Sequence, residues 1–151
     1  MKRFDFEDCI REGLLRKIPP SKEKARSSIA AALKWLGEAE KDLSAEAFNS
    51  SVISSYLAMF HSARALLFLD GFREKSHYCI ARYLEEKYVK RKLLERKWVE
   101  LLDHLRDLRH DDQYSPSFFA TKDEAGGALK TAKDFYKRMT ELLRSRGYEY
   151  E

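Results

Sequence analysis

Apolar side chains recur every three or four residues along most of this 151-residue chain, which is the period of an amphipathic helix. Three segments carry unbroken stripes of this kind. The stripes are Ala25, Ile29, Ala32, Leu36, Ala39 and Leu43, then Leu94, Trp98, Leu101, Leu105 and Leu108, and finally Ala125, Ala128, Ala132, Phe135, Met139 and Leu142. Polar and apolar residues alternate with a period of two nowhere over a useful length. The pattern predicts an all-α protein.

The boundaries of the first helices follow from proline, serine and glycine. Pro19-Pro20 separates a short amphipathic helix within the first 18 residues from a second helix, for which Ser21 is the expected N-cap. The segment from about 44 to 69 is apolar on nearly all sides, which predicts a helix at the centre of a bundle. Ser44 is its expected N-cap, and Gly71 is the expected left-handed residue at its end.

The later boundaries are equally local. Ser76 is expected to cap a helix that runs to about residue 89. Pro116 disfavours helical geometry just before it, so the helix that follows residue 94 should end near Tyr114. Thr121 and Glu124 form a capping box for the last helix. Because the loops are short, the sequence predicts an antiparallel up-and-down bundle of four to five helices plus a short N-terminal helix.

Composition supports one soluble domain over residues 1–151, with a helical extension at 1–20 and the bundle at 21–147. The chain is 44% hydrophobic and 36% charged with 6 Gly and 3 Pro, which excludes a disordered or collagen-like protein. Charges interrupt the first residues, so we expect no secretory signal, and the longest apolar run, Ala65 to Leu69, is too short to cross a bilayer. We therefore expect a cytoplasmic location. Cys9 and Cys79 are far apart and isolated, and we expect two ordinary thiols with neither a disulfide nor a zinc site.

Charge is unevenly distributed along the chain. The formal net charge is +4, yet residues 87–97 alone hold six cations and one anion. This run is either a solvated helix junction or a patch that faces phosphate. The sequence contains no Gly-rich phosphate loop, GxSxG elbow, HExxH or paired Glu-x-x-His motifs, so we expect no metal and no cofactor.

The polar run at residues 109–114 is the most promising place for chemistry. On a helix, His110 lies one turn from Arg106 and from Tyr114, and Arg109 lies one turn from Gln113. These side chains could converge on one cleft. Metal-independent RNA cleavage needs a base, an acid and a cation for the charged phosphorus. The alternative is that cations in a last helical turn only complement the helix dipole.

Three stretches make the chain resemble the HEPN family, in particular short prokaryotic members that pair with a minimal nucleotidyltransferase. They are residues 58–67 (AMFHSARALL), 71–77 (GFREKSH) and 108–117 (LRHDDQYSPS). The resemblance implies a bundle that forms a homodimer with a cleft at its axis. Ribonuclease members carry Arg, then a polar residue, then His four to six positions after the Arg. Arg109 and His110 match the first two positions, whereas Gln113 and Tyr114 stand where the His is expected.

The resemblance and the spacing together define two sets of candidate residues. The catalytic candidates are Arg109, His110 and Tyr114. The nucleotide- or RNA-binding candidates are Arg106, Arg109, Gln113, His61, Arg64, Lys75 and His77, although a lone His61 on an apolar helix also fits a hydrogen-bonded core residue.

Three functions are compatible with these residues. The first is a nucleotide- or RNA-binding dimer that acts with a nucleotidyltransferase, as a toxin–antitoxin component. The second is an active metal-independent endoribonuclease that uses Arg109 and His110. The third is a bundle with a structural or assembly role.

Overall fold

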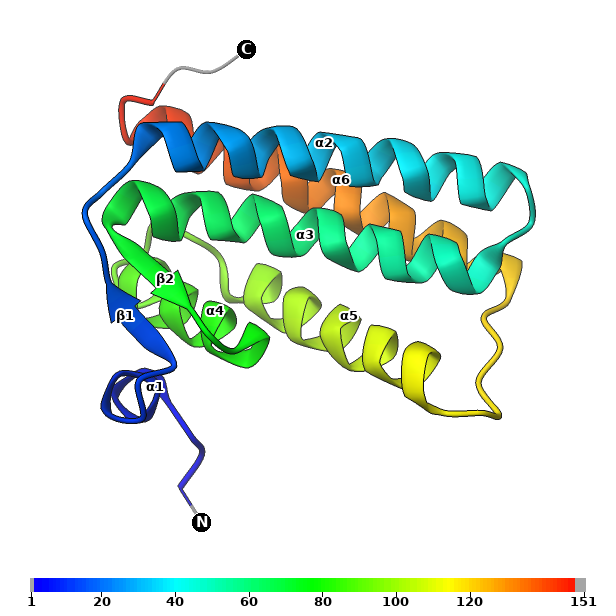
Figure 1. The fold of residues 1–151 in the computed structure, drawn as a ribbon, viewed down its shortest axis with the longest axis horizontal. Helices are drawn as coiled ribbons and strands as arrows, with labels where there is room; N and C mark the ends of the chain where they lie inside the picture. Colours follow the sequence, from blue (N-terminus) through cyan, green and yellow to red (C-terminus); the bar gives the residue numbers. More distant parts are fainter. Residues whose placement is uncertain (1, 149–151) are drawn as a thin grey trace.

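Four long helices form an antiparallel bundle in the computed structural model, which describes residues 2–148 (Figure 1). They are α2 (Lys22–Ser44), α3 (Phe48–Asp70), α5 (Arg96–Tyr114) and α6 (Lys122–Ser145). Shorter elements gather at one end, namely α1 (Phe6–Arg11), α4 (His77–Leu84), the π-helix η1 (Glu85–Val89) and strands β1 (Leu15–Lys17) and β2 (Phe72–Glu74). The predicted helical bundle with a short N-terminal helix is confirmed.

Helix α3 lies at the centre, packed against α2, α5 and α6 (Figure 1). Small residues on α2 and α3 allow close approach, and the buried Ser51 hydroxyl donates to the Ala39 carbonyl at 2.8 Å. By length and composition alone α3 could cross a membrane, but 72% of its most apolar window is buried in the structure. Core helices of soluble proteins pass the same test, so this is weak evidence for a membrane span.

Of the four predicted N-caps, Ser21 and Thr121 are confirmed, Ser76 is at the N-cap position of α4 but makes no side-chain cap hydrogen bond, and Ser44 is wrong. The Ser21 hydroxyl accepts from the Lys24 amide at 3.0 Å, and the capping box of Thr121 and Glu124 is complete. Ser44, in contrast, is the last residue of α2, and α3 begins after Ala47 without a side-chain cap. The Ala45 amide still donates to the carbonyl of Lys41. Because this helical hydrogen bond continues past Ser44, Ser44 belongs to the last turn of α2.

A two-stranded antiparallel sheet was not expected from the sequence. Leu15 pairs with Glu74 and Lys17 with Phe72. Each strand has three residues, which is too short for an alternating pattern to emerge. The pairing brings the N-terminal segment alongside the residues that follow α3.

The expectation that Cys9 and Cys79 are free thiols is wrong, because the two residues form a disulfide. Cys9 lies on α1 and Cys79 on α4, both fully buried, with Cα atoms 6.0 Å apart. They are 70 residues apart in sequence. Sequence spacing cannot predict this disulfide, because only the packing of α1 on α4 brings the two cysteines together.

Candidate functional site

Arg109 is held in place by groups from three helices. It lies near the end of α5, and its guanidinium carbon is 4.9 Å from the centroid of the Tyr56 ring on α3. Nη1 donates to the Gln113 side-chain oxygen at 2.6 Å. Nη2 donates to Nδ1 of His77, the first residue of α4, at 3.3 Å. The guanidinium is therefore preorganised before any ligand arrives.

His77 forms the second part of this cluster. Its ring stacks on Phe60, with centroids 4.1 Å apart, and on Tyr56 at 5.8 Å. The Tyr56 hydroxyl also lies 3.0 Å from His77 Nδ1. Because arginine can only donate, Nδ1 must carry its lone pair and the ring proton must sit on Nε2. The Tyr56 hydroxyl is then a second donor to the same nitrogen.

The local environment keeps the two titratable partners of Arg109, His77 and Tyr56, uncharged. Burial, followed by the charges of Arg109 and Arg64, lowers the pKa of His77 to about 4. Burial raises the pKa of Tyr56 to about 12. At neutral pH His77 is therefore a neutral acceptor and Tyr56 a protonated donor.

The charge of Arg109 is uncompensated. Its hydrogen-bond and ring partners are Gln113, His77 and Tyr56, and over residues 2–148 no carboxylate lies within ion-pair distance. Its buried Nε also has no hydrogen-bond partner in that range. Two neighbouring arginines differ, since Arg106 pairs with Asp103 at 2.5 Å and Arg64 with Glu74 at 2.8 Å. A partly desolvated cation with neutral partners is a ready-made site for an anion.

The remaining candidates from the 58–77 stretches lie beside this cluster. His61 meets Phe60 edge to face at 5.0 Å, and burial lowers its pKa. With Arg64 it lines a groove of about 300 Å³ between α2 and α3. Lys75 is exposed, and its backbone amide donates to the Leu14 carbonyl.

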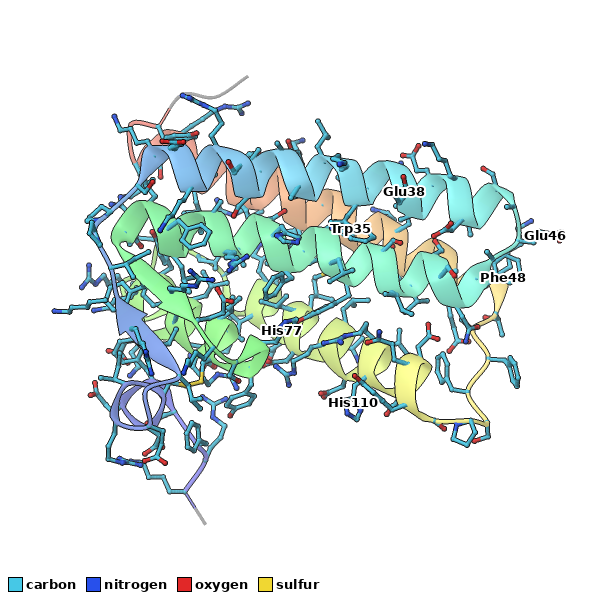
Figure 2. The ribbon with its side chains drawn as sticks, in the orientation of Figure 1. Trp35, Glu38, Glu46, Phe48, His77 and His110 are labelled. Atoms are coloured by element: carbon cyan, nitrogen blue, oxygen red, sulfur yellow. A yellow bond between two sulfur atoms is a disulfide. The ribbon has the colours of Figure 1, made fainter. Side chains whose placement is uncertain are left out.

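His110 and Tyr114 lie on a different face of α5 from Arg109. Their rings contact each other with centroids 4.8 Å apart, and Tyr114 is 68% exposed. His110 points away from the bundle, whereas His77 lies on the side of α4 that meets α3 and α5 (Figure 2). In one copy of the chain the polar run is thus divided between an Arg109–Gln113 face and a His110–Tyr114 face.

Asp112 has a separate role in the same run. The Asn49 side chain donates to Asp112 at 2.8 Å and accepts from the Ala120 amide at 2.9 Å. This bridge ties the end of α5 to the start of α3 and to the loop before α6. Burial raises the pKa of the Asp112 carboxyl.

Tyr56 and Phe60 are the site residues that sequence reasoning missed. Both lie on the most apolar helix, where aromatic side chains normally indicate core packing. Their spacing of four residues on the helix carrying His61 and Arg64 is the one available signal. Across residues 2–148 no group of three or more His, Cys, Asp or Glu side chains could hold a metal ion.

The fold and the Arg109 cluster define a helical-bundle protein with a cationic site where α3, α4 and α5 meet. The HEPN-domain family model matches residues 25–143, and the chain belongs to this family. A search of curated proteins found no significant match. Membership associates the chain with nucleotide- or RNA-related functions in general. Residues 2–24, which include α1 and β1, lie outside the matched segment.

Proposed function

We propose that the protein binds RNA, with Arg109 contacting a backbone phosphate. The observation that carries this proposal is the partly buried Arg109 guanidinium, held by Gln113 and His77 with no carboxylate among its partners in residues 2–148. A phosphate would supply the missing charge through the free N–H groups. His61 and Arg64, which also pairs with Glu74, line the groove between α2 and α3, and with the exposed Lys75 they are the further proposed RNA contacts.

The proposal includes a homodimer in which two Arg109 sites share one cleft. Exposed aromatic side chains at the end of α5 and in the loop that follows it favour an interface there, since Tyr114 is 68% and Phe119 78% exposed. Light scattering should give a mass of twice the chain, and the variant Phe119→Ser should shift the protein toward monomer. A monomer at all concentrations would remove the shared cleft from the proposal.

RNA binding is tested with a labelled single-stranded RNA by fluorescence anisotropy at low salt. Arg109→Ala should weaken binding by about tenfold and reduce the salt dependence by about one phosphate contact. The matched control is Arg138→Ala, which removes the same charge from an α6 arginine paired with Glu95, the N-cap of α5 at the opposite end of that helix from Arg109. Equal losses of affinity in the two variants would show that net charge, and not a specific contact of Arg109, determines RNA binding. No RNA binding by the wild type would leave only a structural role.

A second candidate function is metal-independent endoribonuclease activity with His110 as the acid–base group. It is favoured by the exposure of the His110 ring, which contacts Tyr114 and lies next to Arg109 in sequence. His77 is less suitable as a base, because its Nδ1 accepts two hydrogen bonds and its Nε2 carries the proton. A second copy of the chain would supply the other acid–base group.

Cleavage is tested with structured RNA in EDTA. Activity should disappear in His110→Ala and persist in His104→Ala, the matched control, since His104 is also exposed on α5. Equal activity in both variants would exclude this role for His110.

The proposed partner is a nucleotidyltransferase-type protein, with which the chain would act in the cytoplasm as a toxin–antitoxin component. This part of the proposal rests on the resemblance of residues 58–67, 71–77 and 108–117 to such HEPN proteins. Co-expression with the product of an adjacent nucleotidyltransferase gene should yield a stable complex and change the growth phenotype. If the two co-expressed proteins purify separately, the proposed partnership is contradicted.

A further inference from the structure

A cationic cavity, apart from the Arg109 cluster, lies at the end of the bundle where α3, η1 and α6 meet. Its volume is about 670 Å³, within the range of small-molecule sites. The lining includes the apolar side chains of Leu69, Phe72 and Leu93 and the charged side chains of Asp70, Lys87, Arg91 and Arg146. The lining does not include Arg109, Gln113 or His77.

The single lining carboxylate, Asp70, is fully engaged. Its Oδ2 accepts from the hydroxyls of Tyr83 and Tyr88, each at 2.7 Å, and its Oδ1 pairs with Arg146. Burial raises the pKa of both tyrosines, so their hydroxyls remain donors. Because Arg146 already compensates Asp70, this network leaves no free negative charge in the cavity.

Two further cations in the cavity lining, Lys87 and Arg91, have no compensating carboxylate among residues 2–148. Lys87 Nζ lies 5.2 Å from the Phe6 ring centroid and 5.8 Å from that of Phe72. Arg91 is exposed, one turn further along, and within residues 2–148 no ion pair engages either side chain. The neighbouring carboxylates are occupied, Glu86 by Lys90 and Glu85 by three arginines.

The cavity therefore has three cations against one anion, an excess of two positive charges. A phosphate monoester carries about −1.5 to −2 near pH 7, which matches this excess. Arginine offers a planar pair of donors and lysine a mobile ammonium, the usual combination for phosphate. The apolar wall of Leu69, Phe72 and Leu93 suits an organic moiety better than a bare inorganic ion.

We propose that this cavity binds an organic phosphate monoester of nucleoside size, with Arg91 and Lys87 on the phosphate and the apolar wall against the organic part. The site is separate from the proposed RNA contact at Arg109. It also assigns a function to two cations of the basic run at residues 87–97.

The test is calorimetric titration of the full chain with AMP, adenosine and inorganic phosphate. AMP should bind at least about tenfold more tightly than either of the others, because only AMP uses both the cations and the apolar wall. Arg91→Ala should weaken AMP binding by about tenfold. Since Arg91 is exposed, this variant should fold normally, which thermal melting can verify.

Two controls isolate the cavity. Lys97→Ala removes the same charge from the same basic run but lies outside the cavity lining, and it should leave AMP binding unchanged. Arg109→Ala should also leave AMP binding unchanged while it weakens RNA binding. Losses confined to Arg91→Ala would support this cavity whatever the result for RNA.

Several outcomes would overturn the inference. Equal binding of adenosine and AMP would show that the phosphate does not contribute to affinity. Equal binding of inorganic phosphate and AMP would show that the organic part does not contribute. An equal loss in Lys97→Ala would reduce the effect to overall charge. Loss of AMP binding in Arg109→Ala alone would place the ligand at the Arg109 site and would leave the proposed function intact. No AMP binding by the wild type would refute the proposed ligand site in this cavity but not the proposed RNA binding.

Discussion

His77 is a neutral histidine surrounded by cations. Burial is the largest cause of its lowered pKa, and the charges of Arg109, Arg64 and Arg106 disfavour its protonation further. A neutral ring can accept from Arg109, whereas a protonated ring would have no lone pair at Nδ1 and would repel the guanidinium. The geometry of Arg109 thus depends on the charge state of one imidazole.

The depressed pKa of His77 predicts a specific pH dependence of stability. An ordinary histidine pKa is near 6.5, and that of folded His77 is about 4. Between these values the unfolded chain binds a proton that the folded chain does not, so the free energy of unfolding falls as pH decreases through this window. From pH 7 to 5 this loss should be on the order of 1 kcal/mol, after allowing for solvent screening.

Urea unfolding at pH 7, 6 and 5 measures this effect. His77→Gln should show a shallower decline than the wild type, because the titrating group is gone. His110→Gln, which alters an exposed ring, is the matched control and should retain the wild-type decline. Identical slopes for the wild type and His77→Gln would contradict the assignment.

At the residue scale, sequence reasoning could identify pairs within one helix but not contacts between helices. The spacing of four residues correctly paired Arg109 with Gln113, now observed at 2.6 Å. His77 is 32 residues from Arg109, and the contact depends on how α4 packs against α5. Tyr56 could not be separated from ordinary core aromatics, because only the bound guanidinium distinguishes it.

At the element scale, the turn from α3 into β2 leaves no room for a side chain at Gly71. Gly71 has φ 92°, in the left-handed region, and its carbonyl accepts from the Ile18 amide at 2.9 Å. A Cβ at this position would lie 2.8 Å from the Ile18 carbonyl oxygen and 3.0 Å from Pro20 Cγ. Only glycine satisfies both the backbone angle and the close approach.

Gly71→Ala should therefore destabilise the protein by about 2–4 kcal/mol, which combines the left-handed strain with the backbone clash. The matched control is Gly37→Ala in the middle of α2, where an added Cβ meets nothing within 4 Å. That variant should stabilise by roughly 0.5–1 kcal/mol. Thermal or urea unfolding of both variants gives the comparison, and a neutral effect of Gly71→Ala would show that the turn can relax.

Element prediction succeeded where periodicity and caps agree. All six predicted core positions of α6 are buried, and its capping box is present. On α5 the buried positions are Val99, Leu102 and Leu105, whereas three predicted stripe residues, Trp98, Leu101 and Leu108, are only partly buried. The stripe gave the period correctly, but which side of an amphipathic helix faces inward depends on its neighbours, here α3 and α4.

At the scale of the whole molecule, the segment before α2 is fastened to the bundle at several points. The disulfide joins α1 to α4, β1 pairs with β2, and Arg3 pairs with Glu85 at 2.9 Å. The Tyr78 hydroxyl also donates to the Phe4 carbonyl at 2.7 Å. None of these long-range contacts has a local signature, so sequence analysis placed an extension at 1–20 but not its attachment.

Reduction of the disulfide should lower stability substantially, because it closes a loop of 70 residues. Loop-closure entropy sets an upper value of about 4 kcal/mol. Unfolding of the oxidised and reduced proteins measures the difference, and Cys9→Ser should match the reduced wild type. A thiol assay that finds two free cysteines in the native, unreduced protein would contradict the bond itself.

The way β1 and α1 flank His77 has a practical consequence for choosing fragments. Strand β2, which pairs with β1, ends three residues before His77, and Cys79, which is bonded to Cys9, lies two residues after it. The N-terminal segment is therefore attached to the chain on both sides of this histidine. The family match begins only at residue 25. A fragment trimmed to that boundary would keep every residue of the Arg109 cluster but would lose the strand pairing and the disulfide that hold the chain on either side of His77. Such a fragment would therefore be a misleading substitute for the whole chain in any binding assay.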